Sequence, residues 1–300
     1  MKLLAAAPRA LTPLALLAAA FALIVPSRSV ADRSDVLLAA LVLATALGIA
    51  GSDLLALRDH AGVVIALSVV PLIVLALVAW ALGQLFDQST RDGLLAVGLS
   101  SSEVASVGLV GLAGADATIA LGGVTGSLVL AALVGPVAIG WLAGHGGHGS
   151  GGQLLGRFAL VVIAPLVAGV ALRSLPAAQR WLEPRDEERD GVGAIVVAVL
   201  VYAALSGTNG AHGLGAALIA SLAFLVVSAA LAALWQRRRH DVTAVPGALT
   251  IAMRDFAVAA ALASQAFGNR AAAVPGVYGV VMLLAGSAFV AWVRRSLRTR

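Results

Sequence analysis

Two stretches of sequence decide how this chain folds: DGLLAVGLSSSEVASVGLVG at 92–111 and ALTIAMRDFAVAAALASQAFG at 248–268. Each is an apolar run interrupted near its middle by charge, at Glu103 in the first and at Arg254 and Asp255 in the second. A charged side chain at the centre of a membrane helix costs about 2.5–3.5 kcal/mol on the insertion scale, so the three together cost on the order of 8–10 kcal/mol facing lipid. They must therefore be paired or line a wet cavity.

The composition of the whole chain is that of a membrane protein. Of its 300 residues, 60% are hydrophobic and 12% are charged, whereas soluble domains are about a quarter charged. Apolar runs recur along the chain, and a bilayer core needs roughly 20 apolar residues per helix. The net charge of +5 comes from arginines in expected loops and tails, where membrane topology explains them. We therefore predict an all-α integral membrane protein whose partner is the lipid bilayer, with no nucleic-acid partner.

The apolar runs predict ten transmembrane helices. The expected spans are 12–25, 36–57, 62–86, 93–114, 117–143, 154–175, 191–205, 214–235, 247–268 and 274–293. A Gly/His-rich linker separates the first five from the last five. Because five spans reverse the direction of the chain, the second half enters the membrane with the opposite orientation, as in an inverted repeat. The predicted division is a first repeat at 1–144, a linker at 145–153 and a second repeat at 154–300. An alternative interpretation makes the first span a signal peptide.

The basic residues predict the orientation. With ten spans, the side that holds both termini carries fourteen Lys and Arg residues, namely Lys2, Arg9, Arg58, Arg173, Arg180, Arg185, Arg189, Arg237, Arg238, Arg239, Arg294, Arg295, Arg298 and Arg300. The opposite side carries five, namely Arg28, Arg33, Arg91, Arg157 and Arg270. Since basic residues are retained in the cytoplasm, we expect a multi-pass protein of the inner membrane with both termini cytoplasmic.

The charged interruptions fall in the fourth span of each half. Glu103 lies about ten residues into one span and Arg254 about seven into the other, which places both in the middle third of the bilayer. Polar, interrupted helices at matching positions of two halves indicate the binding site of a transporter. The alternative is a purely structural ion pair between the two helices.

Several motifs in order resemble the bile acid:sodium symporter family and its relatives, which include arsenite efflux carriers. They are ALGIAGSDLLALRDH at 46–60, ALSVVPLIVLALVAWALG at 66–83 with its mid-helix Pro71, the fourth and fifth spans with Asp116 at the tight turn between them, and the ninth span. The resemblance implies a panel domain of spans one, two, six and seven. It implies a core domain in which the fourth and ninth helices break and cross, and small organic anions, such as bile acids and other carboxylates, as substrates. Half-helix N-termini, which carry partial positive charge, would suit such a substrate.

The sodium ligands that the resemblance implies are poorly matched. The corresponding positions here hold Ala66, Ser106, Val107, Thr250, Met253, Arg254 and Asp255. Only Ser106 and Met253 are kept, the latter through its backbone. Arg254 puts a fixed positive charge where a sodium ion would sit, so we predict that the guanidinium neutralises Glu103 or Asp255 in its place. Transport would then be uniport, exchange or coupled to protonation of a carboxylate.

The predicted substrate- and ion-binding residues are Glu103, Ser106, Thr250, Met253, Arg254 and Asp255. We predict no catalytic residue, no enzymatic activity, no metal site and no cofactor, with Na⁺ or H⁺ as candidate coupling ions. His145 and His148 are interpreted as linker rather than metal ligands, Asp53 as a surface partner of Arg58, and Arg157 as snorkelling to the membrane interface. The alternative functions are an arsenite-type efflux carrier and a transport-inactive membrane scaffold or sensor.

Overall fold

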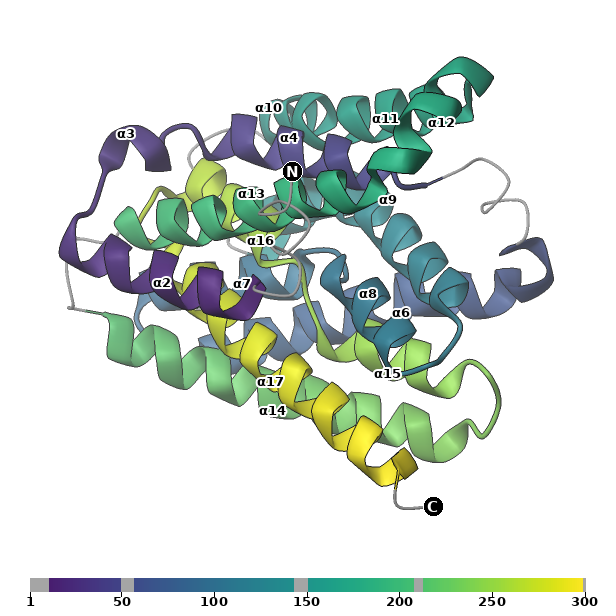
Figure 1. The fold of residues 1–300 in the computed structure, drawn as a ribbon. Helices are drawn as coiled ribbons and strands as arrows, with labels where there is room; N and C mark the ends of the chain where they lie inside the picture. The colour runs from purple at the N-terminus through teal and green to yellow at the C-terminus, as the bar shows by residue number, and fades with distance from the viewer. Residues whose placement is uncertain (1–10, 50–56, 143–150, 208–212, 299–300) are drawn as a thin grey trace.

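A computed structural model of the chain describes residues 11–49, 57–142, 151–207 and 213–298. This part of the chain is helical, apart from short connections (Figure 1). The helices of the first half are α2 (Leu11–Ile24), α3 (Arg28–Ala31), α4 (Ser34–Ala46), the 3₁₀ turn η2 (Leu57–His60), α6 (Ala61–Gly83), α7 (Gln88–Leu99), α8 (Ala105–Leu112) and α9 (Ala117–Leu142). Those of the second half are α10 (Gly151–Phe158), the π-helical turn η4 (Ala159–Ile163), α11 (Ala164–Ser174), α12 (Pro176–Leu182), the 3₁₀ turn η5 (Glu183–Arg185), α13 (Asp186–Ser206), α14 (Leu214–Arg238), α15 (Ala244–Ala252), α16 (Phe256–Phe267) and α17 (Ala273–Arg298).

Five helical segments in the described residues are long and apolar enough to cross a bilayer. They are Ala61–Gly83, Ala117–Leu142, Gly152–Ser174, Glu188–Ser206 and Leu214–Arg238. Many large apolar side chains on these helices are exposed, such as Trp141 and Leu160. Exposed apolar surface on a bundle of long apolar helices is expected where lipid, rather than water, surrounds the protein. The chain is therefore an all-helical membrane protein.

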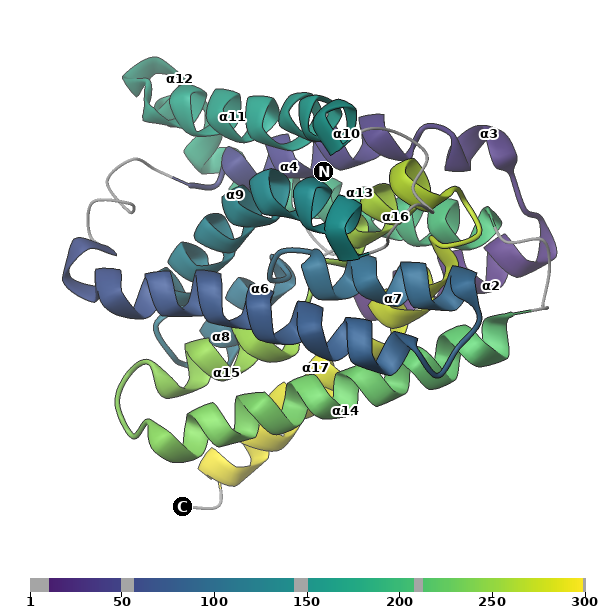
Figure 2. The same ribbon diagram turned by 180° about the vertical axis from the view of Figure 1, so that it is seen from behind.

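The helices pack in two groups. One group contains α2, α4, α11 and α13, which pack on one another, and the other contains α6, α7, α9, α14, α15 and α17. Figure 1 shows α4, α11 and α13 along the top of the molecule and α14 and α17 along the bottom, and Figure 2 shows the same arrangement from behind. The groups meet where α17 packs on α13 and α2, and where α16 packs on α4 and α13.

Some helix ends differ from the predicted spans. The second span was expected to reach residue 57, but α4 ends at Ala46, and residues 50–56 lie outside the described part. Helix α10 already begins at Gly151, inside the expected linker, and α13 begins at Asp186, five residues before the expected start at 191. This early start has a physical reason: Asp186 accepts hydrogen bonds from Arg173 and Arg189, so that the charged first turn is satisfied as helix.

Candidate functional site

Two interrupted helices cross at the centre of the molecule. Helix α7 ends at Leu99 and α8 begins at Ala105, while α15 ends at Ala252 and α16 begins at Phe256, so both expected breaks are present. The two extended segments, 100–104 and 253–255, pair in an antiparallel manner through Ser102 and Arg254. The N–H of Glu103 donates to the carbonyl of Met253 over 3.0 Å, and that of Asp255 donates to the carbonyl of Ser101 over 2.8 Å. Backbone N–H and C=O groups that lose their helical partners at one break thus form hydrogen bonds with the other break.

The two central residues of the crossing have equivalent supports. The N–H of Ser102 donates to the hydroxyl of Ser127 in α9 over 2.9 Å. The N–H of Arg254 donates to the hydroxyl of Tyr278 in α17 over 3.1 Å. In each half, the middle residue of the extended segment is therefore anchored by a hydroxyl from the next long helix, α9 or α17. Sequence reasoning missed both hydroxyls, whose only signal was a polar group in a long apolar helix.

A carboxylate caps the helix that follows each break. Asp255 accepts from the N–H groups of Ala257 (2.9 Å) and Val258 (3.0 Å) at the start of α16, and from the Ser101 hydroxyl (3.4 Å). Glu103 accepts from the N–H of Ala105 at the start of α8 over 3.4 Å, and its Oε2 atom has no partner. Both side chains are buried.

These caps correct an expectation about the helix N-termini. The partial positive charge of α8 and α16 was expected to suit an anionic substrate, but carboxylates of the chain itself already hold both helix starts. An acidic side chain at a helix N-terminus neutralises the dipole that would otherwise attract an anion.

Arg254 lacks the ion pair that was expected for it. Its side chain is fully buried, at 0% exposure, and none of its three guanidinium nitrogens has a hydrogen-bond partner in the described structure. No carboxylate there lies within 4 Å of it, so Arg254 forms no direct ion pair with Glu103 or Asp255, although Asp255 is near enough to interact with it electrostatically.

The pairing of the two extended segments explains why the ion pair is absent. Successive side chains of extended backbone point to opposite faces, and directly opposed residues share a face. Ser102 and Arg254 are directly opposed and therefore share one face of the crossing. Glu103 and Asp255 are each one position further along and fall on the other face, where Ser101 contacts Asp255. The Ser102 hydroxyl, also fully buried, has no partner in the described structure either.

Comparison with known protein families identifies the type of molecule. The model of the SBF-like CPA transporter family matches residues 51–288, a range that includes both breaks and both anchoring hydroxyls. This chain belongs to the SBF-like CPA transporter family. A search of curated proteins found no match. Because the family is related to the bile acid:sodium symporters, the resemblance noted in the sequence is confirmed.

Family relationship to sodium symporters raises the question of whether sodium fits here. The Ser106 hydroxyl donates to the carbonyl of Glu103 over 2.6 Å, and the Thr250 hydroxyl donates to the carbonyl of Pro246. The Met253 carbonyl accepts from Glu103. Na⁺ needs several oxygens directed at one point, whereas the same crossing buries the guanidinium of Arg254, whose positive charge repels a cation. The residues present do not fit a sodium site.

Of the six predicted site residues, five lie at the crossing, and Thr250 lies two residues before the end of α15. Outside it, Asp116 accepts from the N–H of Thr118 and caps α9, in line with its expected place at a turn. Arg157 does not simply snorkel, because it forms an ion pair with Asp35 at 2.9 Å. Asp53, His145 and His148 lie outside the described residues.

Proposed function

We propose that the protein is a sodium-independent secondary transporter of a small organic anion, and that Arg254 binds the anionic group. The observation that carries the proposal is the buried guanidinium of Arg254, which has no partner among the described residues although it lies at the centre of two broken helices. Ionisable groups buried in a membrane protein mark transport pathways, and breaks at depth are tolerated where they line a site.

The energetics of a buried arginine support an anionic ligand. A charge taken out of water without a partner costs several kcal/mol, and a paired one recovers much of this. A carboxylate that enters the site can accept two parallel hydrogen bonds from a guanidinium. The Ser102 hydroxyl, on the same face, supplies a further donor. Substrate binding would therefore remove the two unsatisfied groups of this face together.

The same proposal extends to the architecture. We infer ten spans in two inverted repeats. The inference is supported by the equivalence of residues 101–103 with 253–255 and of Ser127 with Tyr278. The anchoring hydroxyl follows the central residue of its break at nearly the same distance in sequence in both halves. The group formed by α2, α4, α11 and α13 corresponds to the panel domain, and the crossing lies in the core domain. The excess of arginines at one end of the bundle supports cytoplasmic termini in the inner membrane.

Ligand-dependent stabilisation of the purified protein in detergent tests the proposal. Carboxylates of increasing size, with arsenite as a separate arm, are screened with and without Na⁺, followed by uptake into proteoliposomes. We expect stabilisation by at least one carboxylate, independent of Na⁺, that is lost in Arg254→Gln and kept in the control Arg185→Gln. Arg185 is exposed and stacks on Trp181. Strong Na⁺ stimulation that survives Arg254→Gln would refute sodium independence, and no response from any anion would favour a transport-inactive scaffold.

A further inference from the structure

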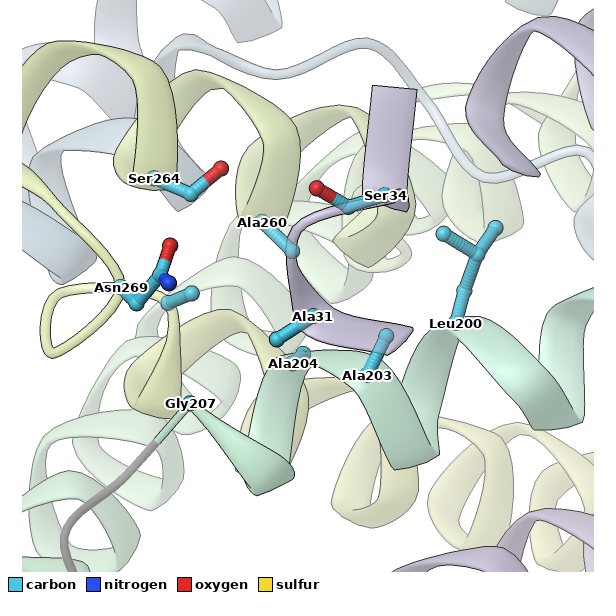
Figure 3. Close-up of a pocket in the computed structure, with 10 residues that line it drawn as sticks. Ala31, Ser34, Leu200, Ala203, Ala204, Gly207, Ala260, Ser264 and Asn269 are labelled. Atoms are coloured by element: carbon cyan, nitrogen blue, oxygen red, sulfur yellow. The ribbon is translucent and has the colours of Figure 1, made fainter. Parts of the chain in front are cut away.

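The two helix groups meet at a seam with few polar contacts, at the end of the bundle where α4 begins and α16 ends. A small pocket lies in this seam between α4, α13, α16 and the start of α17 (Figure 3). Its walls are mostly small side chains, including Ala204 of α13 and Ala260 of α16. Ser34 and Ser264 point toward one another across it. A surface of small side chains lets helices approach closely without interlocking.

Two hydrogen bonds join the groups across this seam. The amide nitrogen of Gln265, near the end of α16, donates to Oδ1 of Asp35 in the first turn of α4 over 2.6 Å. The amide of Asn269 donates to Oδ1 of Asp32 over 3.4 Å. The amide oxygen of Gln265 is buried without a partner in the described structure, so this side chain is held there through its bond to Asp35. A hydrogen bond to a charged acceptor is among the stronger kinds.

The half of the crossing on this side is tightly packed. Residues 92–99 of α7 are all buried, as are residues 256–263 of α16. On the other side, residues 246–251 of α15 are buried as well, whereas Gly108, Gly111 and Leu112 of α8 are exposed. Gln265 lies ten residues beyond Asp255, about 15 Å along the helix at 1.5 Å per residue. The seam therefore lies on the tightly packed side of the crossing, away from the exposed residues of α8.

We propose that Asp35 and Gln265 form a latch that holds the two helix groups together at this end, and that the latch opens when the transporter changes its accessible side. The inference rests on the proposed transport function, in which alternating access arises when one helix group moves against the other. The Asp35–Gln265 bond is the shorter of the two hydrogen bonds across this seam, and such a movement has to break it; a hydroxyl contact between Thr12 and Ser287 joins α2 to α17 elsewhere. The Asp32–Asn269 bond, which is longer, adds a second and weaker contact.

Absence of cysteine from the sequence makes a direct test possible. Ala204→Cys places a single thiol in the seam, where Ala204 is buried. The rate at which a maleimide labels it in the purified full-length protein reports opening. Gln265→Leu removes the donor, and since one hydrogen bond to a charged group corresponds to about one order of magnitude or more in an equilibrium, we expect labelling about tenfold faster. The control Gln84→Leu removes an exposed amide bond to the Trp80 carbonyl, which lies within one helix and does not cross the seam.

A swap of donor and acceptor separates a latch from a merely structural contact. Asp35→Asn with Gln265→Glu exchanges the two roles but also removes the Asp35–Arg157 ion pair, so it is measured beside Arg157→Gln, and we expect the swap to label as slowly as that variant. Unchanged labelling in Gln265→Leu, or an equal acceleration in Gln84→Leu, would overturn the proposal, and so would a swap that labels as fast as Gln265→Leu. Labelling requires no substrate, so the latch can fail while Arg254-dependent anion binding stands. Loss of anion binding with an intact labelling pattern would instead refute the transport proposal.

Discussion

Replacement of Arg254 by methionine should make the substrate-free protein more stable and abolish anion binding at the same time. Methionine fills a similar elongated volume and carries no charge. The guanidinium of Arg254 is fully buried and has no partner in the described structure. Replacement of buried ionic groups by apolar ones of similar size stabilises proteins by up to about 1–4 kcal/mol. Two charge-assisted hydrogen bonds to a carboxylate, at about 1.5–3 kcal/mol each, correspond to a loss of two to four orders of magnitude in affinity.

The assay is thermal unfolding in detergent with and without the best carboxylate from the screen. Arg173→Met is the matched control, because Arg173 is also buried but forms two hydrogen bonds with Asp186, at 3.2 and 3.3 Å. Loss of that pair should lower the unfolding temperature. We expect Arg254→Met to raise it by several degrees, since roughly 2–4 °C accompanies each kcal/mol in chains of about 150–250 residues. An Arg254→Met protein as destabilised as Arg173→Met would show that the guanidinium stabilises the fold and would refute the reasoning.

Three further predictions concern the scaffold of the site. Asp255→Ala should destabilise the protein by about 1–2 kcal/mol in thermal unfolding, because two N–H groups lose their cap, and Glu103→Ala should cost less, since Glu103 accepts one long bond. Gly98→Ala should lower the free energy of unfolding by about 1–3 kcal/mol, because its new methyl group would lie 2.7 Å from the Leu75 carbonyl oxygen. The control Gly140→Ala adds a methyl group that meets nothing within 4 Å and should be neutral. Equal unfolding temperatures of the two variants would contradict this. A hydrogen bond from the hydroxyl of Thr90 lowers the pKa of Asp87 below its usual 3.8. The stability that this cap contributes is therefore present above pH 3.8 and is lost as the pH falls through the lowered pKa. Asp87→Ala should flatten the acid side of the profile of unfolding temperature against pH.

The sequence was sufficient to predict the two breaks but not the way they pair. Glu103 and Arg254 interrupt apolar runs, and the cost of burying charge in lipid predicts that they are paired or line a wet cavity; the family resemblance added that the helices break there. The register in which the two extended segments pair could not be predicted, because it depends on backbone hydrogen bonds between segments about 150 residues apart. The predicted ion pair failed for the same reason. Opposite charges at similar depth favour pairing, but alternation along the extended segments puts Arg254 on a different face from Glu103 and Asp255.

The equivalence of the two breaks also locates where the site departs from symmetry. Glu103 matches Asp255 as a helix cap, and Ser127 matches Tyr278 as an anchor. These matched groups satisfy the backbone of the crossing, which any broken helix in a membrane requires. At the central position the halves differ, with Ser102 in one and Arg254 in the other.

A requirement of the fold alone would not place a guanidinium at this position, because the N–H of Arg254 is already satisfied by Tyr278 and its side chain contributes no hydrogen bond to the described structure. Serine performs the same backbone role in the other half with a far smaller desolvation cost. The additional positive charge is thus the part of the crossing that packing and hydrogen bonding leave unexplained. A bound anion would account for it, and this is why we assign the transport function to Arg254 rather than to the carboxylates beside it.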